Sequence, residues 1–344
     1  MRIITTIILG FIHFVTAGQT LGGNAAYNFL KLPPSPLLTA AGSVNVSYRT
    51  DDAGLAVNNP ALLQPALHSM AGVAFNGFPA GINTYSLTGA YHHQSLETTF
   101  GGQLYFLDYG AVPQTDPAGN ESGQFRPVDF VIQMAAARQY LLKWNYGASV
   151  KLIHSRYGQY RSTVLALDVG LHYADSVSGI DAGFTAKNMG AQIKKYGTEG
   201  EDLPFDLQIG VTKKLANAPF AFSANAQQLH RFNILYNDTS FNNENRFDER
   251  GGFFNKLLNH FVIASHIYIG DHIEATVGYN HLRRSELNLA ESANGLNGFS
   301  MGVRVRFSGL QFMYARSQYQ SNLAYNQVGL NLKLNQLVGL GKDL

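Results

Sequence analysis

The chain has no cysteine among its 344 residues, which excludes a disulfide framework and a lipoprotein anchor. Charge is also scarce, because Asp, Glu, Lys and Arg make up 14% of the residues, whereas soluble domains carry roughly 25%. After the N-terminus there is no apolar run of about 18 residues, which excludes a helical membrane protein. Basic residues form no run longer than Lys194-Lys195 or Arg283-Arg284, so nucleic acid is not an expected partner.

The N-terminus has the pattern of an export signal. Met1-Arg2 is followed by an apolar run from Ile3 to Val15 and then by the small residues Ala17 and Gly18. A basic start, a short apolar stretch and small residues at the cut are typical of a cleaved signal peptide. We therefore predict a signal peptide over 1–18; a buried N-terminal strand or helix is the alternative.

From residue 70 onward, apolar and polar residues alternate. In one stretch Trp144, Tyr146, Ala148, Val150 and Leu152 alternate with Asn145, Gly147, Ser149 and Lys151. Successive side chains of a strand point to opposite faces, so such runs are typical of a wall between lipid and water. Each run has roughly the length that a tilted strand needs to cross a bilayer. The runs lie at 70–78, 84–93, 97–108, 126–140, 143–154, 161–175, 179–188, 205–214, 219–229, 256–269, 272–282, 298–307, 309–317 and 326–335.

The links between these runs alternate in length, as the short periplasmic turns and longer external loops of outer-membrane barrels do. The longer links lie at 109–125, 155–160, 189–204, 230–255, 283–297 and 318–325. The sequence thus predicts an all-β fold, a transmembrane antiparallel β-barrel of about fourteen strands over 70–336 in the outer membrane of a Gram-negative bacterium, with a tail at 337–344. A soluble periplasmic all-β domain is the alternative, but its polar faces would need more charge.

Residues 19–69 do not read as membrane strands, since Pro33-Pro34-Ser35-Pro36 interrupts both helices and sheets. The lumen of a fourteen-stranded barrel is wide enough to hold a filling segment. We expect this segment to enter the barrel as a plug; a periplasmic extension outside the barrel is the alternative.

Two motifs in this segment carry a family resemblance. The first is the Tyr27, Asn28, Phe29, Leu30 stretch, and the second comprises Asn58, Asn59, Pro60, Ala61, Leu62 and Leu63. Both resemble the N-terminus of the PorV and PorQ barrels of the type IX (Por) secretion system in Bacteroidota, with PorQ-like proteins the closer match. The second motif is more loosely similar to the plug of FadL-type long-chain fatty acid channels.

The resemblance implies a non-enzymatic role in protein secretion. It implies a barrel that anchors or scaffolds the cell-surface attachment complex, with PorZ as the first expected partner and PorU and PorV beside it. The alternative is a FadL-type channel for long-chain fatty acids or other hydrophobic molecules. A general porin is the third possibility, and the plug-like segment argues against it.

Charged residues within the strands are expected to face the lumen, because Arg or Lys facing lipid costs about 2–4 kcal/mol at the bilayer midplane. They should form ion pairs that fix the plug or line a wet interior. The predicted lumen-facing charges are Lys151, Asp168, Asp181, Lys187, Asp206, Glu274, Arg304, Arg306 and Lys333.

The sequence contains no nucleophile elbow, phosphate-binding loop or zinc-protease pattern. We therefore expect no enzyme activity, no metal site and no cofactor. The long mixed-charge loop after strand nine is the candidate partner contact, because functional contacts concentrate on loops. Its charged residues are Asp238, Glu244, Arg246, Asp248 and Glu249.

Overall fold

The structure is a computed structural model that describes residues 26–78, 81–116, 118–234, 252–287, 295–320, 323–337 and 339. The predicted signal peptide at 1–18 lies outside these residues, as does most of the predicted tail at 337–344. Across the described parts of the chain, no helix combines the length and the apolar character needed to cross a bilayer.

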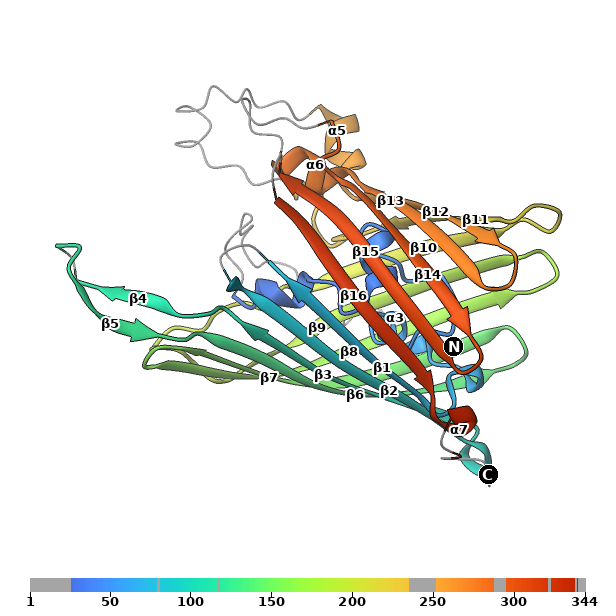
Figure 1. Cartoon of the computed structure of the whole chain (residues 1–344), viewed down its shortest axis with the longest axis horizontal. Coiled ribbons are helices and arrows are strands. Elements are labelled where there is room, and N and C mark those ends of the chain that lie inside the picture. The colour runs from blue at the N-terminus through green and yellow to red at the C-terminus, as the bar shows by residue number, and fades with distance from the viewer. Residues whose placement is uncertain are drawn as a thin grey trace, which may run out of the picture.

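Fourteen antiparallel strands form one closed barrel, in which the first strand pairs with the last, so that Met70 lies opposite Lys333 (Figure 1). The predicted fold class is therefore confirmed. The barrel strands are β1 (Met70–Gly77), β2 (Asn83–His93), β3 (Thr98–Asp108), β6 (Val128–Tyr140), β7 (Trp144–Tyr157), β8 (Tyr160–Asp175), β9 (Ile180–Lys194), β10 (Asp206–Lys214), β11 (Phe220–Ala226), β12 (Phe261–Ile269), β13 (Ile273–Asn280), β14 (Phe299–Phe307), β15 (Leu310–Gln320) and β16 (Leu323–Lys333).

The other strands and the helices lie in the loops and in the N-terminal segment. β4 (Val112–Thr115) and β5 (Glu121–Phe125) form a separate hairpin that projects from the barrel (Figure 1). The helices are η2 (Asn28–Lys31), α2 (Pro36–Ala40), α3 (Ala53–Ala56), η3 (Pro60–Leu62), η4 (Pro65–Leu67), η6 (Gln94–Leu96), α5 (Phe253–Leu258), α6 (His281–Leu287) and α7 (Leu334–Leu337).

Several predicted boundaries were wrong. The predicted strand at 256–269 begins only at Phe261, because its first residues belong to α5. The predicted loops at 155–160 and 318–325 are largely strand, so that β7 and β8 meet in a tight turn. In contrast, the predicted loops 109–125 and 283–297 contain the β4–β5 hairpin and part of α6.

The two faces of the wall have opposite chemistry. On β7 the outward-facing Val150 and Leu152 are 48% and 39% exposed, whereas the inward-facing Ser149 and Lys151 are buried. Aromatic side chains mark both ends of this outer face: the Trp144 and Tyr173 rings lie 4.9 Å apart at the end with the short turns, and the Tyr279 and Phe299 rings lie 4.8 Å apart at the other end. Such an apolar exterior with aromatic girdles is that of a barrel in lipid, and its short-turn end is periplasmic.

β9 is irregular at its middle and near its external end. Its pairing with β8 shifts register twice, between Thr163 and Val164 and between Leu167 and Val169, and Asn188 has a φ of 59°. Each shift reverses the inward and outward alternation. The prediction that this strand ends at residue 188 was therefore wrong, because the apolar-polar period breaks there although the strand continues to Lys194.

Candidate functional site: the filled lumen and its outer cavity

Residues 26–69, here called the luminal segment, lie inside the barrel and contact strands on all sides of it (Figure 1). Thr39 donates to Gln327 Oε1 on β16 at 2.5 Å. Gln133 Nε2 on β6 donates to the Val57 carbonyl at 3.2 Å, and His172 Nε2 on β8 lies 3.0 Å from the Ser47 carbonyl. Only a segment within the lumen can reach strands that far apart around the wall.

Side-chain caps hold the short helices of the luminal segment. Asp52 accepts a hydrogen bond from Gly54 N at 2.9 Å at the start of α3, and Asn331 of β16 donates to the same Asp52 oxygen at 3.1 Å. Ser35 accepts from Leu37 N at the start of α2, where Pro36 suits the first helical position. The caps thus serve both the local helices and their attachment to the wall.

The predicted plug motif is buried against the wall. Asn59 caps η3 by accepting from Ala61 N at 3.1 Å, and its amide donates to the Val46 carbonyl at 2.8 Å. The motif residues Asn58, Asn59, Pro60, Ala61, Leu62 and Leu63 are all buried. The asparagines therefore turn the backbone and join two stretches of the luminal segment.

Wall glycines let the luminal segment approach the strands closely. A Cβ atom at Gly183 of β9 would lie 1.9 Å from the Val46 carbonyl oxygen, and one at Gly170 of β8 would lie 1.9 Å from Asn59 Oδ1. Side-chain atoms cannot occupy these positions unless the segment moves. This role was not predicted, because a glycine that admits the luminal segment has the same place in the strand period as any other small inward-facing residue.

The other resemblance motif begins the luminal segment. Tyr27 and Phe29 are buried against inward-facing residues of β3 and β6, including Tyr105 and Val131, whereas Asn28 is exposed and Leu30 half-buried. Gln192 Nε2 of β9 donates to the Tyr27 hydroxyl at 2.7 Å. This motif thus packs at the external half of the lumen.

Three predicted lumen charges meet near the periplasmic end, in what we call the arginine cluster. Arg304 pairs with Glu274 and with Asp51 of the luminal segment, the latter at 2.7 Å, and Arg306 reaches Glu274 at 2.8 Å. The Tyr48 hydroxyl donates to Glu274 at 2.8 Å. Glu274 and Arg304 are each 1% exposed, so the cluster ties the luminal segment to β13 and β14 through enclosed charges.

The carboxyl group of Asp51 makes this attachment dependent on pH. Burial raises the pKa of Asp51, but attraction by Arg304 and Arg306, with a smaller contribution from Lys333, outweighs it and leaves that pKa below its ordinary value. An acid with a lowered folded pKa contributes stability above its unfolded pKa of about 4 and loses it as pH falls through the folded value. We expect Asp51→Asn to be less stable than the unmodified protein at neutral pH and equally stable in strong acid, as measured by urea unfolding in lipid vesicles. Equal loss of stability at both pH values would contradict this.

A second group of predicted charges lies halfway up the lumen. Lys151 pairs with Asp168 at 2.6 Å and donates to Asn188 Oδ1 at 2.9 Å. Lys187, on the next strand, donates to Asn58 of the plug motif. Among the described residues, no carboxylate lies within ion-pair distance of Lys187. Its charge is therefore paired with a neutral amide.

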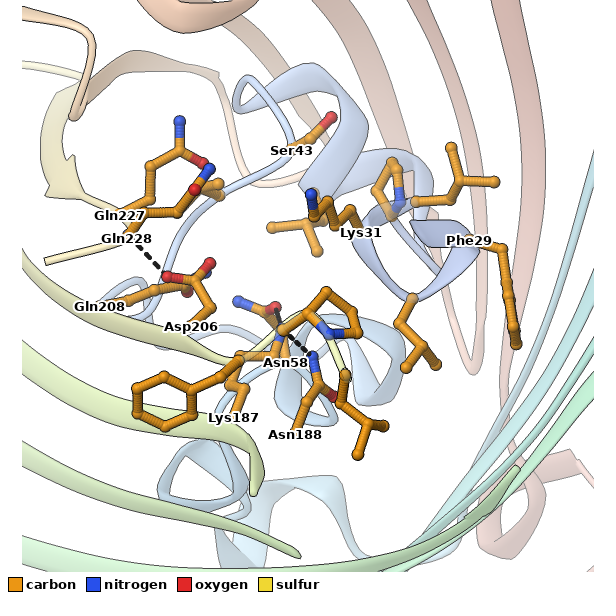
Figure 2. A pocket seen from close by; sticks show the side chains of 18 of the residues that line it. Phe29, Lys31, Ser43, Asn58, Lys187, Asn188, Asp206, Gln208, Gln227 and Gln228 are labelled. Carbon is orange, nitrogen blue, oxygen red and sulfur yellow. Dashed lines mark hydrogen bonds between the residues drawn. The ribbon is translucent and has the colours of Figure 1, made fainter. Parts of the chain in front are cut away.

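A cavity of about 370 Å³ lies between the luminal segment and the external loops (Figure 2). Its charged lining residues are Lys31, Lys151, Lys187, Arg231, Arg283, Asp202, Asp206 and Glu286. Apolar side chains line it between these, including Phe29, Leu30, Leu32, Leu203 and Phe205. Partial burial lowers the pKa of Lys31 and raises the pKa of Glu286, although both residues remain exposed to solvent. The lining is thus amphipathic, with more cations than anions.

The remaining predicted residues do not all join this cavity. Asp206 does, and it accepts hydrogen bonds from Gln208 and from the Gln228 backbone at 2.6 Å each. Lys333 is half-buried at the periplasmic end near Asp51. The predicted partner-loop residues Asp238, Glu244, Arg246, Asp248 and Glu249 lie outside the described residues. Among those described, no group of three or more acidic or histidine side chains is arranged to hold a metal.

Beside the cavity, the strand pairing of the barrel wall is incomplete. β10 pairs with β9 only as far as Asp206 opposite Lys187, so the external half of β9 is paired on its β8 side alone. The following loop closes over this edge through side chains: Asn188 Nδ2 donates to the Pro204 carbonyl at 2.8 Å, and Glu201 N donates to Gln192 Oε1 at 2.6 Å. We call this stretch the β9 seam.

A closed fourteen-stranded barrel with an apolar exterior and a polar, filled interior defines an integral outer-membrane protein. No family model matches the chain, and no curated protein matches it. Solved structures of outer-membrane channels share its fold. The CymD monoaromatic hydrocarbon channel has a TM-score of 0.53 at 14% identity, covering 89% of this chain and 97% of CymD. The Pseudomonas putida toluene transporter TodX has a TM-score of 0.50 at 12% identity, covering 86% and 95%.

At these identities the similarity shows the fold alone. CymD is described as a monoaromatic hydrocarbon channel and TodX as a toluene transporter. The comparisons give no support to the PorQ-like identity that the N-terminal motifs suggested. A role in type IX secretion therefore stays a prediction.

Proposed function

We propose that this protein is a FadL-like outer-membrane channel for amphipathic hydrophobic molecules, with long-chain fatty acids as the first candidate. The observation that carries the proposal is the cavity of about 370 Å³ with its amphipathic lining. Cavities of this size are typical of small-ligand sites, which combine apolar walls with a few placed polar groups. Lys31 and Lys187 supply cations for a carboxylate head group, and Phe29, Leu30 and Phe205 supply surface for an acyl chain.

The channel needs an exit as well as a binding site, and the β9 seam is our candidate. A hydrophobic molecule leaving through it would enter the membrane without crossing the arginine cluster, which lies near the periplasmic end of the lumen. The seam is held by side-chain hydrogen bonds and not by a strand ladder, so opening it breaks few bonds. The luminal segment meanwhile acts as a plug against water-soluble molecules.

Binding of a fluorescent long-chain fatty acid to the purified protein in detergent tests the site. We expect binding at micromolar concentration and a Kd that is roughly ten- to a hundredfold weaker in Lys187→Met, because hydrogen bonds to charged groups contribute about 1.5–3 kcal/mol. Lys213→Met is the matched control, since Lys213 lies on β10 outside the cavity. Unchanged affinity in Lys187→Met, or equal loss in both variants, would contradict the assignment.

The seam is tested by cross-linking, for which a chain without cysteine is well suited. In Gln192→Cys/Glu201→Cys, a short reducible thiol cross-linker should abolish most fatty acid uptake by cells, and a reductant should restore it. Each single-cysteine variant, treated in the same way, is the control for loss of the native side chain. Full uptake by the cross-linked double variant would show that molecules leave by another route.

The secretion role is the second candidate function, favoured by the Tyr27–Leu30 and Asn58–Leu63 motifs. It predicts that PorZ, PorU or PorV co-purifies with the solubilised barrel and that deletion releases surface-bound cargo. Fatty acid binding without any of these partners favours the channel. Partners without fatty acid binding favour the scaffold.

A further inference from the structure

A short helix at the external rim has an apolar face that is largely exposed. In α5, Phe253 is 62% exposed, Phe254 is 75% exposed and Leu258 is 45% exposed. Together with Leu257 these residues occupy positions i, i+1, i+4 and i+5, which lie on one side of a helix. Lys256 is half-buried, and Asn259, directly after the helix, is buried and accepts a hydrogen bond from Ser285. The apolar side therefore faces away from the protein, the reverse of an ordinary surface helix.

This apolar face continues the lipid-facing surface of the barrel. Only two residues separate α5 from β12, whose outward-facing Phe261 and Ile263 are 39% and 52% exposed. Ile263 lies opposite Tyr279 of β13, and the Tyr279 ring lies 4.8 Å from Phe299 of β14. These aromatic residues form the external girdle, at the level where the membrane meets water.

A second segment adds to the same surface. Phe232, which follows β11, is 52% exposed, and its ring lies 5.5 Å from that of Phe253. Its neighbours Arg231 and Asn233 line the outer cavity. This stretch of chain thus separates the cavity from an apolar surface on the outside of the rim. A contiguous group of exposed aromatic side chains marks a contact surface, whereas single exposed apolar residues are ordinary.

We propose that α5 is an interfacial helix whose phenylalanine side chains insert among the acyl chains of the outer leaflet, beside the external rim of β12. Lipid is the occupant because the helix face and the lipid-facing row of β12 are continuous, at the level of the aromatic girdle. Helices that lie in a membrane interface bury one apolar face into the boundary between head groups and acyl chains and keep their polar side in water. The proposal does not depend on what the cavity binds.

The experiment uses a tryptophan as a depth probe, since Trp144 is the chain's single tryptophan. Phe254→Trp is placed in a Trp144→Phe background, and the folded barrel is put into phosphatidylcholine nanodiscs with or without brominated acyl chains. Bromine quenches a tryptophan that touches the chains, so we expect about a twofold loss of fluorescence and weak quenching by aqueous iodide. Two controls in the same background set the scale: Ile263→Trp in the wall and Ser122→Trp on the projecting β4–β5 hairpin.

Each pattern of quenching either supports or overturns the placement of α5 in the membrane interface. Quenching of Phe254→Trp by bromine, close to that of Ile263→Trp, supports the interfacial helix. Strong iodide quenching without bromine quenching, as expected for Ser122→Trp, would place α5 in water and overturn the proposal. Protection from both quenchers would mean that a second copy of the chain or another part of the protein covers the face, and would overturn it as well. Circular dichroism of each variant verifies that the barrel is folded.

Discussion

Arg304→Met is expected to destabilise the folded protein by about 3–5 kcal/mol, the usual cost of leaving a buried charge without its partner. Arg304 is enclosed between Glu274 and Asp51, and its loss removes both ion pairs at once. Arg306 would keep its contact with Glu274 at 2.8 Å, so the loss stays at the lower end of this range if Arg306 moves inward. Urea unfolding in lipid vesicles, followed by tryptophan fluorescence, measures the effect.

Two further variants separate the buried pair from a general effect of losing a charge. Arg316→Met removes an exposed arginine from the same hairpin and should change stability by about 0.5 kcal/mol or less. Glu274→Gln/Arg304→Met removes both buried charges and should recover part of the loss, since no Glu274 carboxylate is then left without Arg304, and Asp51 keeps Arg306 at 3.9 Å. A double variant as unstable as the sum of its singles would contradict the ion-pair explanation.

The number of strands and their positions could be predicted because the wall of a barrel has one requirement along its whole length. Each strand must turn an apolar row to lipid and a polar row inward, so periodicity alone identifies it. The prediction failed where the backbone does not follow this alternation of apolar and polar residues. In β9 the bulge at Asn188 reverses the alternation, and in α5 the apolar residues continue the pattern of β12 although the backbone is helical.

The candidate site could be predicted only in part, for a related reason. Lumen-facing charges follow from the strand period, and the pairing of Glu274 with Arg304 follows from strands that are neighbours in sequence. Their partner Asp51 comes from the luminal segment, 253 residues before Arg304, and no periodicity connects it with β14. The outer cavity is likewise built from the luminal segment and several loops, so its lining cannot be read from any one stretch of chain.

Gly183→Leu should convert the barrel from a closed to a conducting state. A side chain at Gly183 would occupy the position of the Val46 carbonyl, so residues 45–47 must leave the wall. The same stretch is held by two asparagines: the Asn59 amide donates to the Val46 carbonyl, and Asn225 Oδ1 accepts from Val46 N. Displacing it should therefore loosen the luminal segment as a whole. The lumen of a fourteen-stranded barrel is wide enough to conduct once it is not filled.

We therefore expect stepwise conductance in planar bilayers for Gly183→Leu, on the order of tenfold or more above the background of the unmodified protein, since an open lumen of this size admits water and ions. Gly102→Leu is the matched control, because the nearest atom to a Cβ at Gly102 is a backbone oxygen 3.8 Å away, in the adjacent strand rather than in the luminal segment. If Gly183→Leu stays silent while its circular dichroism shows a folded barrel, the luminal segment tolerates the displacement and does not seal the lumen at this point. If the unmodified protein already conducts as strongly as the variant, the lumen is open around the segment, and the plug function proposed for it is wrong.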